Sequence, residues 1–168
     1  MNDQENQTIM LFGTFDHLHA GHENLFLQAK ALAKRFANPI IVTVIARDKT
    51  VKQIKGRKAD YNEKTRQKNL EETTWSDVVT LGEKKDKAKA IKNFRPSIIA
   101  LGYDQFAFTQ NLEKLIIDLN LDTKIVRLKP YQPGIYKSSL IREKHASLKS
   151  SSSNKKSLPT KHFESVSK

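Results

Sequence analysis

The chain has 168 residues, which is enough for a single domain with a substantial buried core. It holds 30 Lys and Arg against 18 Asp and Glu, and the resulting net charge of +12 favours an anionic partner. Because the chain has no cysteine, disulfides, thiolate catalysis and cysteine-based zinc sites are excluded. Its apolar runs are too short to span a bilayer, and the polar start MNDQENQT lacks the features of a secretory signal, so we expect a cytoplasmic protein.

Strands and helices alternate along the predicted chain. In order, we expect a strand at 8–12, a helix at 21–36, a strand at 39–46, a helix capped by Asn62 that runs to about 72, a strand at 78–81, a helix at 85–94, a strand at 97–101, a helix at 111–119, a strand at 123–128 and a last helix that opens with residues 138–144. The lysine-rich segment 49–58 is predicted as a loop. The alternation predicts right-handed crossovers and a Rossmann-like, doubly wound parallel α/β sheet of about five strands. In such sheets, ligands bind beyond the carboxyl ends of the strands.

The composition of the chain changes near residue 146. From there to the end, Ser and Lys dominate and apolar residues are sparse, so this segment cannot bury enough surface to offset its ordering entropy. We therefore predict a flexible N-terminus at 1–7, one domain at 8–145 and a disordered basic tail at 146–168. The tail is expected to be inert; if it bound RNA or a membrane surface, that affinity would fall steeply with salt.

The stretch GTFDHLHAGHE, which begins at Gly13, joins the first predicted strand to the first helix. Backbone N–H groups at the start of a helix attract phosphate, and Gly13 and Gly21 permit a close approach of the backbone. His19 and His22 share one helix face, so both imidazoles can donate hydrogen bonds to phosphate oxygens. The carboxylate of Asp16 suits a metal ligand or a brace for the loop. The sequence thus predicts a phosphate-binding turn.

These residues resemble the GTFD…HxGH signature of the cytidylyltransferase-like nucleotidyltransferases. Further stretches match that family in the expected order: Ile45-Ala46-Arg47-Asp48, Glu63-Lys64-Thr65-Arg66, Leu101-Gly102-Tyr103-Asp104-Gln105 and Ser138-Ser139-Leu140-Ile141. The similarity covers residues 8–144. Within the family, the ARD and LGYDQ stretches are most similar to archaeal-type FAD synthases, and glycerol-3-phosphate cytidylyltransferases come next. Relatives usually carry an apolar residue at the position of His17, so this histidine is interpreted as incidental.

The resemblance implies a nucleotidyl transfer in which a phosphate oxygen of the acceptor attacks the α-phosphorus of a nucleoside triphosphate and pyrophosphate leaves. It implies Mg²⁺ bridging the phosphates, with ATP and FMN as substrates; the alternative is CTP with glycerol 3-phosphate or a similar small phosphate. The implied catalytic residues are His19, His22 and Arg66. The expected nucleotide-binding residues are Gly13, Thr14, Phe15, Asp16, Gly21, Lys52, Lys55, Gly102, Tyr103, Asp104, Lys137, Ser138 and Ser139, and the expected acceptor-binding residues are Arg47, Asp48, Gln105 and Phe106. Phe106 and Phe108 either stack on a flat acceptor or pack the loop onto the core.

The closing motif departs from the family pattern, which begins with an arginine. No arginine stands at that position here, and Lys137 or Arg127 is the candidate replacement. A lysine supplies a point charge rather than a planar fork, which leaves the choice between ATP and CTP open. A homodimer is also left open. A non-catalytic nucleic-acid-binding or regulatory module would explain the net charge, but a binding module would not need the combination of His19, His22 and Arg66.

Overall fold

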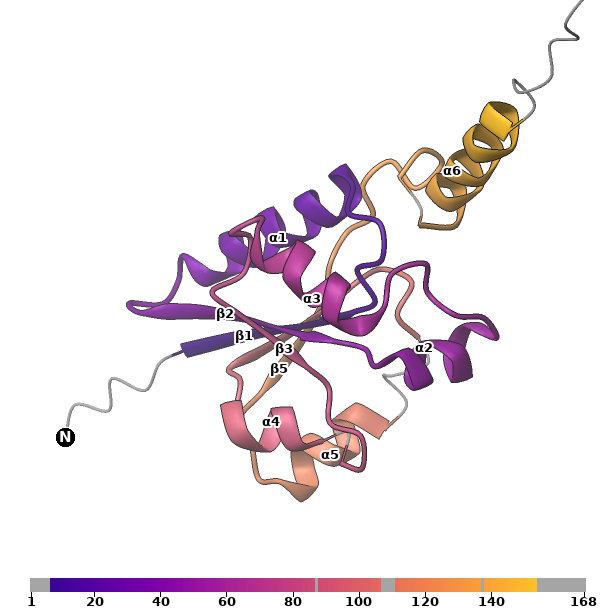
Figure 1. Ribbon diagram of the computed structural model, residues 1–168. Coiled ribbons are helices and arrows are strands. Elements are labelled where there is room, and N and C mark those ends of the chain that lie inside the picture. Colours follow the sequence, from indigo (N-terminus) through magenta and orange to yellow (C-terminus); the bar gives the residue numbers. More distant parts are fainter. Residues whose placement is uncertain (1–6, 87, 107–110, 137, 154–168) are drawn as a thin grey trace, which may run out of the picture.

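The computed structural model describes residues 7–86, 88–106, 111–136 and 138–153. Within these ranges, five parallel strands form one sheet in the order β3-β2-β1-β4-β5 (Figure 1). The strands are β1 (Gln7–Gly13), β2 (Pro39–Ile45), β3 (Val78–Leu81), β4 (Ile98–Leu101) and β5 (Lys124–Arg127). The helices are α1 (Ala20–Ala33), α2 (Asp48–Lys55), α3 (Glu63–Glu71), α4 (Lys89–Phe94), α5 (Leu112–Asp118) and α6 (Ser138–Ser153). The predicted Rossmann-like α/β fold is confirmed, and each predicted strand lies within one residue of its expected bounds.

Strand β1 forms the centre of the sheet, with β2 on one side and β4 on the other. Its side chains alternate between the two faces, as the pleat of a strand requires. Ile9 packs in one core cluster with Phe26 of α1, whereas Met10 packs in the other with Ile91 of α4. Helices α1 and α3 accordingly cover one face, and α4 and α5 cover the other (Figure 1). Burial on both faces explains why the central strands are almost continuously apolar.

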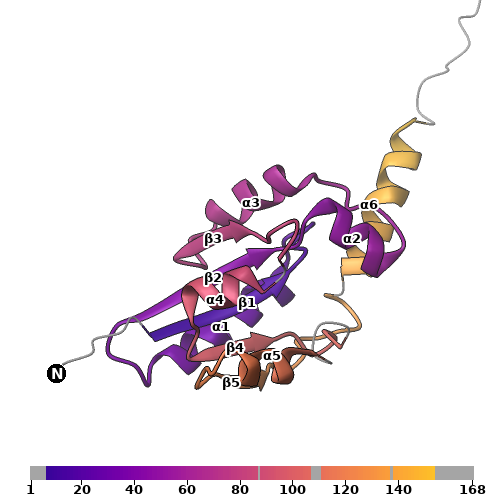
Figure 2. The ribbon, with the colours of Figure 1, turned by 90° about the horizontal axis from the view of Figure 1, so that it is seen from below.

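The strand order places β1 at the centre of the sheet, because the connection from β3 to β4 returns the chain to the free side of β1. The chain builds outward from β1 through β2 to β3, then returns to the opposite side of β1 with β4 and β5. The carboxyl ends of β1 and β4 are therefore neighbours where the winding reverses, which is where open α/β sheets bind ligands. Figure 2 shows α2 and α6 at this same end of the molecule.

Two segments differ from the predicted organisation. The segment predicted as a lysine-rich loop contains α2, which is anchored by the buried Val51 and ends at Gly56 with a φ of 68°. One apolar residue in a short basic stretch is a weak helix signal, which explains the error. Helix α6 continues to Ser153, past the predicted domain boundary at residue 145, because no glycine or proline interrupts its sequence.

None of the helices that the structure describes combines the length and the apolar character that a membrane crossing would need. The predictions of a flexible N-terminus and a disordered tail also involve residues 1–6 and 154–168, which lie outside the described residues. Lys137 and Phe108 lie outside them as well.

Candidate functional site

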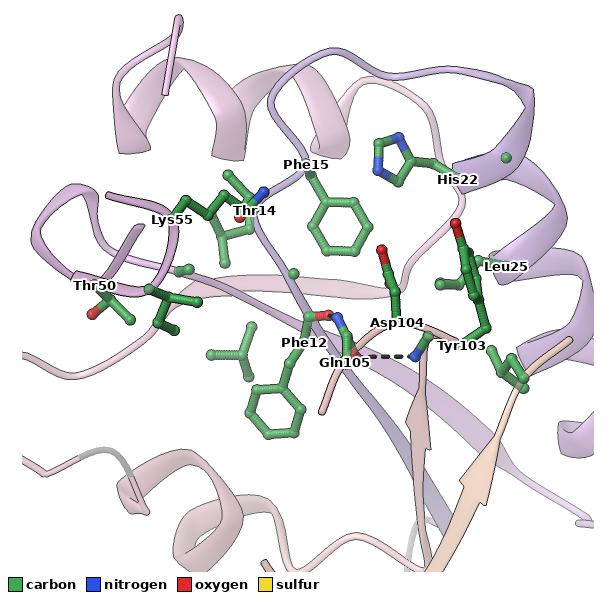
Figure 3. Close-up of a pocket in the computed structure, with 18 of the residues that line it drawn as sticks. Phe12, Thr14, Phe15, His22, Leu25, Thr50, Lys55, Tyr103, Asp104 and Gln105 are labelled. Carbon is green, nitrogen blue, oxygen red and sulfur yellow. Dashed lines mark hydrogen bonds between the residues drawn. The ribbon is translucent and has the colours of Figure 1, made fainter. Parts of the chain in front are cut away.

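The loops that follow β1, β2 and β4 enclose a cavity of about 470 Å³ at the carboxyl edge of the sheet. Figure 3 shows Tyr103 and Asp104 on one side of this cavity, with His22 above them and Lys55 across from them. The predicted site residues on its wall are Gly13, Thr14, Phe15, His19, Gly21, His22, Arg47, Lys55, Gly102, Tyr103, Asp104, Gln105 and Phe106. Among the described side chains, the predicted site residues that are not on this wall are Asp16, Asp48, Lys52, Arg66 and Ser139. The side chain of Ser138 lies outside the described part of the chain.

The bend between β1 and α1 is held from beneath by an aromatic side chain. Gly13 leaves room for the ring of Phe15, because a Cβ at position 13 would lie 2.5 Å from a ring carbon. Phe15 has a φ of 50°, in the left-handed region that residues other than glycine rarely adopt. The ring is buried and packs against Phe26 in the core, with centroids 5.6 Å apart. Core packing therefore holds this bend in a strained backbone conformation.

His19 and His22 lie side by side where α1 begins. His19 is the N-cap residue, and its Nδ1 accepts a hydrogen bond of 3.1 Å from the backbone N–H of Gly21. Because Nδ1 is the acceptor, the proton of the neutral His19 ring is on Nε2. The two imidazoles stack with centroids 3.9 Å apart. A Cβ on Gly21 would lie 2.8 Å from the His19 ring and 3.0 Å from the carbonyl oxygen of Tyr136, so this arrangement requires glycine.

Burial favours the neutral form of both imidazoles. It lowers the pKa of His22 to about 3, with smaller contributions from His19 and Lys55, while a hydrogen bond to the backbone of His17 opposes the shift. The pKa of His19 is also lowered, first by burial and then by His17. Within the described residues, Nδ1 of His22 is buried without a hydrogen-bond partner. Because an unsatisfied buried nitrogen is costly, this atom indicates a position for a ligand group.

Of the two lysines predicted to reach the phosphates, Lys55 lies on the cavity wall and Lys52 does not. Lys55 is exposed as a residue, but desolvation lowers the pKa of its ammonium, and Arg57 lowers it further. Asp104 opposes this shift, as a carboxylate near an ammonium does. Lys55 is thus the lysine of the predicted pair that contributes positive charge to the cavity.

Arg66 was expected to contact phosphate, and in this structure its guanidinium has other partners. The residue is 0% exposed and lies behind the cavity wall. Its guanidinium donates to the carbonyl oxygens of Tyr61 at 3.0 Å, Thr14 at 2.6 Å and Ala46 at 2.8 Å, and it pairs with Asp48 at 2.7 Å. These four acceptors follow β1, follow β2 or precede α3. Their positions explain why the Arg66 side chain points into the protein. In this structure Arg66 therefore braces the loops that form the cavity.

Arg47 and Asp48, both expected to bind the acceptor, take part in the junction between α2 and α3. Arg47 lines the cavity, yet its guanidinium donates to Glu63 at 2.8 Å and to the carbonyl oxygen of Gly82. Glu63 also accepts from the backbone N–H of Asp48 at 2.9 Å, and the backbone N–H of Glu63 donates to Asp48 at 3.2 Å. The hydrogen bond from Asp48 and then that from Arg47 lower the pKa of Glu63. Asp48 thus has a structural role in this junction, and its expected acceptor contact stays a prediction.

Asp16 holds the strained bend against the loop that precedes α3. It is 9% exposed, and its two oxygens accept hydrogen bonds from the backbone N–H groups of Asp60 and Tyr61, each at 2.8 Å. Among the described residues, ligand-capable atoms of Asp16, His17 and Asp60 lie within 4.8 Å of one another. Both Asp16 oxygens already accept hydrogen bonds, and the cluster is not part of the cavity wall. The geometry supports the brace, and a metal role for Asp16 stays a prediction.

The loop after β4 is fixed from below and presents aromatic surface to the cavity. The side chain of Gln105 accepts from the backbone N–H of Gly102 at 3.0 Å and donates to the carbonyl oxygen of Phe12. Arg127, at the end of β5, donates to the carbonyl oxygen of Gly102 at 3.0 Å, and its guanidinium carbon lies 4.8 Å from the centre of the Phe106 ring. Phe106 is 66% exposed at the cavity mouth. Gln105 thus acts as a clamp, while the ring of Phe106 is placed to meet a ligand.

Sequence reasoning missed two tyrosines of the cavity wall. The Tyr136 ring is nearly parallel to His19, with centroids 6.3 Å apart, and Tyr131 stacks on Tyr136 at 5.7 Å. Both precede α6, in the segment where the sequence departs from the family pattern. Aromatic residues in a stretch rich in proline and glycine were the available signal.

The comparisons with known proteins agree with this geometry. The chain matches the cytidylyltransferase-like family over residues 10–144. It is 35% identical over 136 residues to a FAD synthase of Picrophilus torridus, an alignment that covers 81% of this chain and 94% of the relative. It is similar to the crystal structure of a lipopolysaccharide core biosynthesis protein from Thermoplasma volcanium, with a TM-score of 0.66, 32% identity and coverage of 75% of this chain and 98% of the other. A pantoate-beta-alanine ligase from Francisella tularensis, with a TM-score of 0.56, 15% identity and coverage of 85% and 67%, shares the fold.

The fold and the histidine site together define a Rossmann-like nucleotidyltransferase. The chain belongs to the cytidylyltransferase-like family.

Proposed function

We propose that this protein is an FMN adenylyltransferase, which transfers the adenylyl group of ATP to the phosphate of FMN and releases pyrophosphate. The observation that carries the transfer is the stacked His19–His22 pair at the carboxyl edge of the sheet, in which a buried imidazole nitrogen has no hydrogen-bond partner among the described residues. The acceptor follows from the FAD synthase relative that aligns with most of the chain. In the reaction, a phosphate oxygen of FMN forms a bond to the α-phosphorus of ATP as the bond to the pyrophosphate oxygen breaks.

The two histidines donate hydrogen bonds to phosphate oxygens in different protonation states. With the proton of neutral His19 on Nε2, this nitrogen donates to a phosphate oxygen without a fixed charge. His22 has its low pKa because it is desolvated, and a phosphate oxygen next to the ring favours the protonated form. Positioned donors of this kind stabilise the charge that develops in the transition state. Lys55 adds a positive charge across the cavity.

The cavity also fits a divalent cation that is held mainly by the nucleotide. Mg²⁺ in phosphate-transferring sites needs one or two protein carboxylates, because the phosphates and waters supply its other oxygen ligands. Glu83 and Asp104 place carboxylates on the cavity wall, and Asp104 is close enough to Lys55 to affect its pKa. Asp104 is therefore the residue that would hold the ion, which would shield the negative charge of the phosphates when bound. The hydroxyls of Ser138 and Ser139, at the start of α6, are proposed to contact the triphosphate.

The cavity mouth suits a flat aromatic acceptor. Phe106 and Tyr131 are exposed residues of the cavity wall, and the exposed Ile54 adds apolar surface to it. A flavin ring gains from stacking on such side chains. Glycerol 3-phosphate has no apolar part that would use this surface. A homodimer, and a location in the cytoplasm, stay predictions.

A pyrophosphate-release assay that combines ATP or CTP with FMN or glycerol 3-phosphate tests the proposal. We expect release with ATP and FMN in the presence of Mg²⁺, together with formation of FAD. The His22→Ala variant serves as the control for contaminating activity. Release with CTP and glycerol 3-phosphate, and none with ATP and FMN, would replace this function by the cytidylyltransferase alternative.

A further inference from the structure

The loop before α3 carries a carboxylate that the proposed reaction does not use. Asp60 is not part of the cavity wall, yet it joins two segments that are far apart in the sequence. Its Oδ2 is 2.7 Å from Nε2 of His17, in the bend after β1. Its Oδ1 pairs with Nη2 of Arg142 in α6. One side chain thus connects the bend that carries the catalytic histidines to the C-terminal helix.

Helix α6 stands apart from the sheet in both ribbon views (Figures 1 and 2). Arg142 also donates to the carbonyl oxygen of Lys58 at 3.2 Å, and the ring of His145 stacks on His17 with centroids 5.0 Å apart and an interplanar angle of 17°. Arg142 and His145 are three residues apart, so they lie on one face of the helix. These contacts define that face as the side on which α6 docks.

We propose that Asp60 is a positioning residue, which sets the place of the first turn of α6 relative to the histidine pair. The backbone of Asp60 is itself fixed, because its N–H donates to Asp16 at 2.8 Å beneath the bend. Arg142 follows Ser139 by less than one helical turn, so docking of Arg142 determines where the serine end of α6 lies. This inference rests on the proposed function, in which Ser138 and Ser139 contact the triphosphate.

Loss of the ion pair between Asp60 and Arg142 should affect the docking of α6 rather than the stability of the whole domain. The side chains of Asp60 and Arg142 are 32% and 31% exposed. Partly exposed ion pairs contribute little to the stability of a domain, so loss of this pair should release α6 without unfolding the sheet. If only the docked state binds the triphosphate with its serines, the apparent dissociation constant rises in proportion to the loss of docked molecules.

The first test uses hydrogen exchange on full-length protein and needs no substrate. Asp60→Asn, which removes the charge, should speed amide exchange in α6 and leave the exchange of β1 and β2 unchanged. Asp60→Glu, which keeps a carboxylate, should restore part of the protection. Asp86→Asn is the matched control, because it removes a similar exposed ion pair with Lys92 on the opposite face of the sheet. Unchanged exchange in α6 of Asp60→Asn would overturn the docking role.

The second test measures ATP binding with Mg²⁺ by calorimetry, and KM and kcat where turnover is found. We expect the dissociation constant and KM for ATP to rise about two- to fivefold in Asp60→Asn, with kcat within about twofold of the wild type. Faster exchange in α6 with unchanged ATP affinity would overturn the positioning role. A wild-type protein that binds ATP but does not adenylate FMN would refute only the proposed acceptor. A wild-type protein that does not bind ATP would refute the proposed function and the positioning role together.

Discussion

The network around Arg66 and the stacked histidine pair both adjoin the bend between β1 and α1, and they differ in whether their polar atoms have hydrogen-bond partners. Each nitrogen of the Arg66 guanidinium donates to a carbonyl oxygen or a carboxylate, at 0% exposure. In the histidine pair, Nδ1 of His22 has no partner within the described chain. The comparison distinguishes side chains that stabilise the cavity wall from side chains with an unsatisfied atom that a ligand can bind, although the family motif contains both kinds.

The largest expected effect concerns Arg66. Substitution by Met should lower the free energy of unfolding by about 3–5 kcal/mol, because it leaves buried carbonyl oxygens and the partly buried Asp48 without their donor. Urea denaturation measures this loss, and Lys68→Met, an exposed change on the same helix, is the control. Arg66→Lys should also destabilise, since a single ammonium cannot reach all four acceptors. Wild-type stability in both Arg66 variants would show that the network is dispensable.

The histidines should show the opposite behaviour. His19→Ala and His22→Ala are each expected to reduce turnover by about 10²–10³-fold, because each removes a donor to the developing charge. Circular dichroism should find the fold retained, and Lys30→Ala on the exposed side of α1 should have normal activity. Near-normal turnover in either histidine variant would remove the pair from the reaction.

The low pKa of His22 predicts a dependence of stability on acid. The unfolded state protonates His22 near its ordinary pKa of 6.5, whereas the folded state does so near 3, so stability falls as the pH drops through this window. We expect the wild type to lose about 1.4 kcal/mol more per pH unit than His22→Gln between about pH 6 and pH 4. Parallel curves of unfolding free energy against pH for the two proteins would contradict a buried, neutral imidazole.

Asp16→Asn should have a smaller effect. An amide presents one oxygen and one NH₂ group where two backbone N–H donors meet, so the variant should lose about 1–3 kcal/mol of stability. Activity at saturating substrate should persist, and the Mg²⁺ concentration for half-maximal activity measures the metal role. A shift of that concentration without any loss of stability would make Asp16 a metal ligand rather than a brace.

The two lysines of α2 provide the finest comparison. Lys55→Ala should raise KM for ATP by about tenfold, because it removes a charge-assisted contact to the phosphates. Lys52→Ala changes the net charge equally but lies off the cavity wall, so its KM should stay near the wild-type value. Equal effects in the two variants, each reduced by salt, would indicate general electrostatic attraction instead of a specific contact.

The sheet could be predicted from the sequence because its signal is local. Residues 39–46 are β-branched and apolar without interruption, and this pattern determines both the strand and its burial. Helix α2 gave a weaker signal, since Val51 is the buried apolar residue of a short basic segment. The extension of α6 beyond residue 145 was missed because Ser and Lys indicate disorder by composition, although neither stops a helix.

The wall of the cavity could be predicted in large part, and the roles of individual side chains could not. The motif places Arg66 in the right helix, but its inward direction depends on acceptors contributed by Thr14 and Ala46, which are distant in the sequence. The motif likewise led us to expect that Gln105 binds the acceptor. Its hydrogen bond to the carbonyl oxygen of Phe12 depends instead on the adjacency of β1 and β4. Such contacts are set by the folded topology rather than by spacing.

The adjacency of β1 and β4 has a consequence for how this site can diverge. The histidines proposed to serve the transfer step follow one strand, and the aromatic surface proposed for the acceptor follows another. Mutation can therefore remodel the acceptor surface through Phe106 while the imidazoles keep their surroundings. An engineer who wants a new acceptor should vary Phe106 and Tyr131 and leave Asp104, Gln105 and the bend between β1 and α1 unchanged.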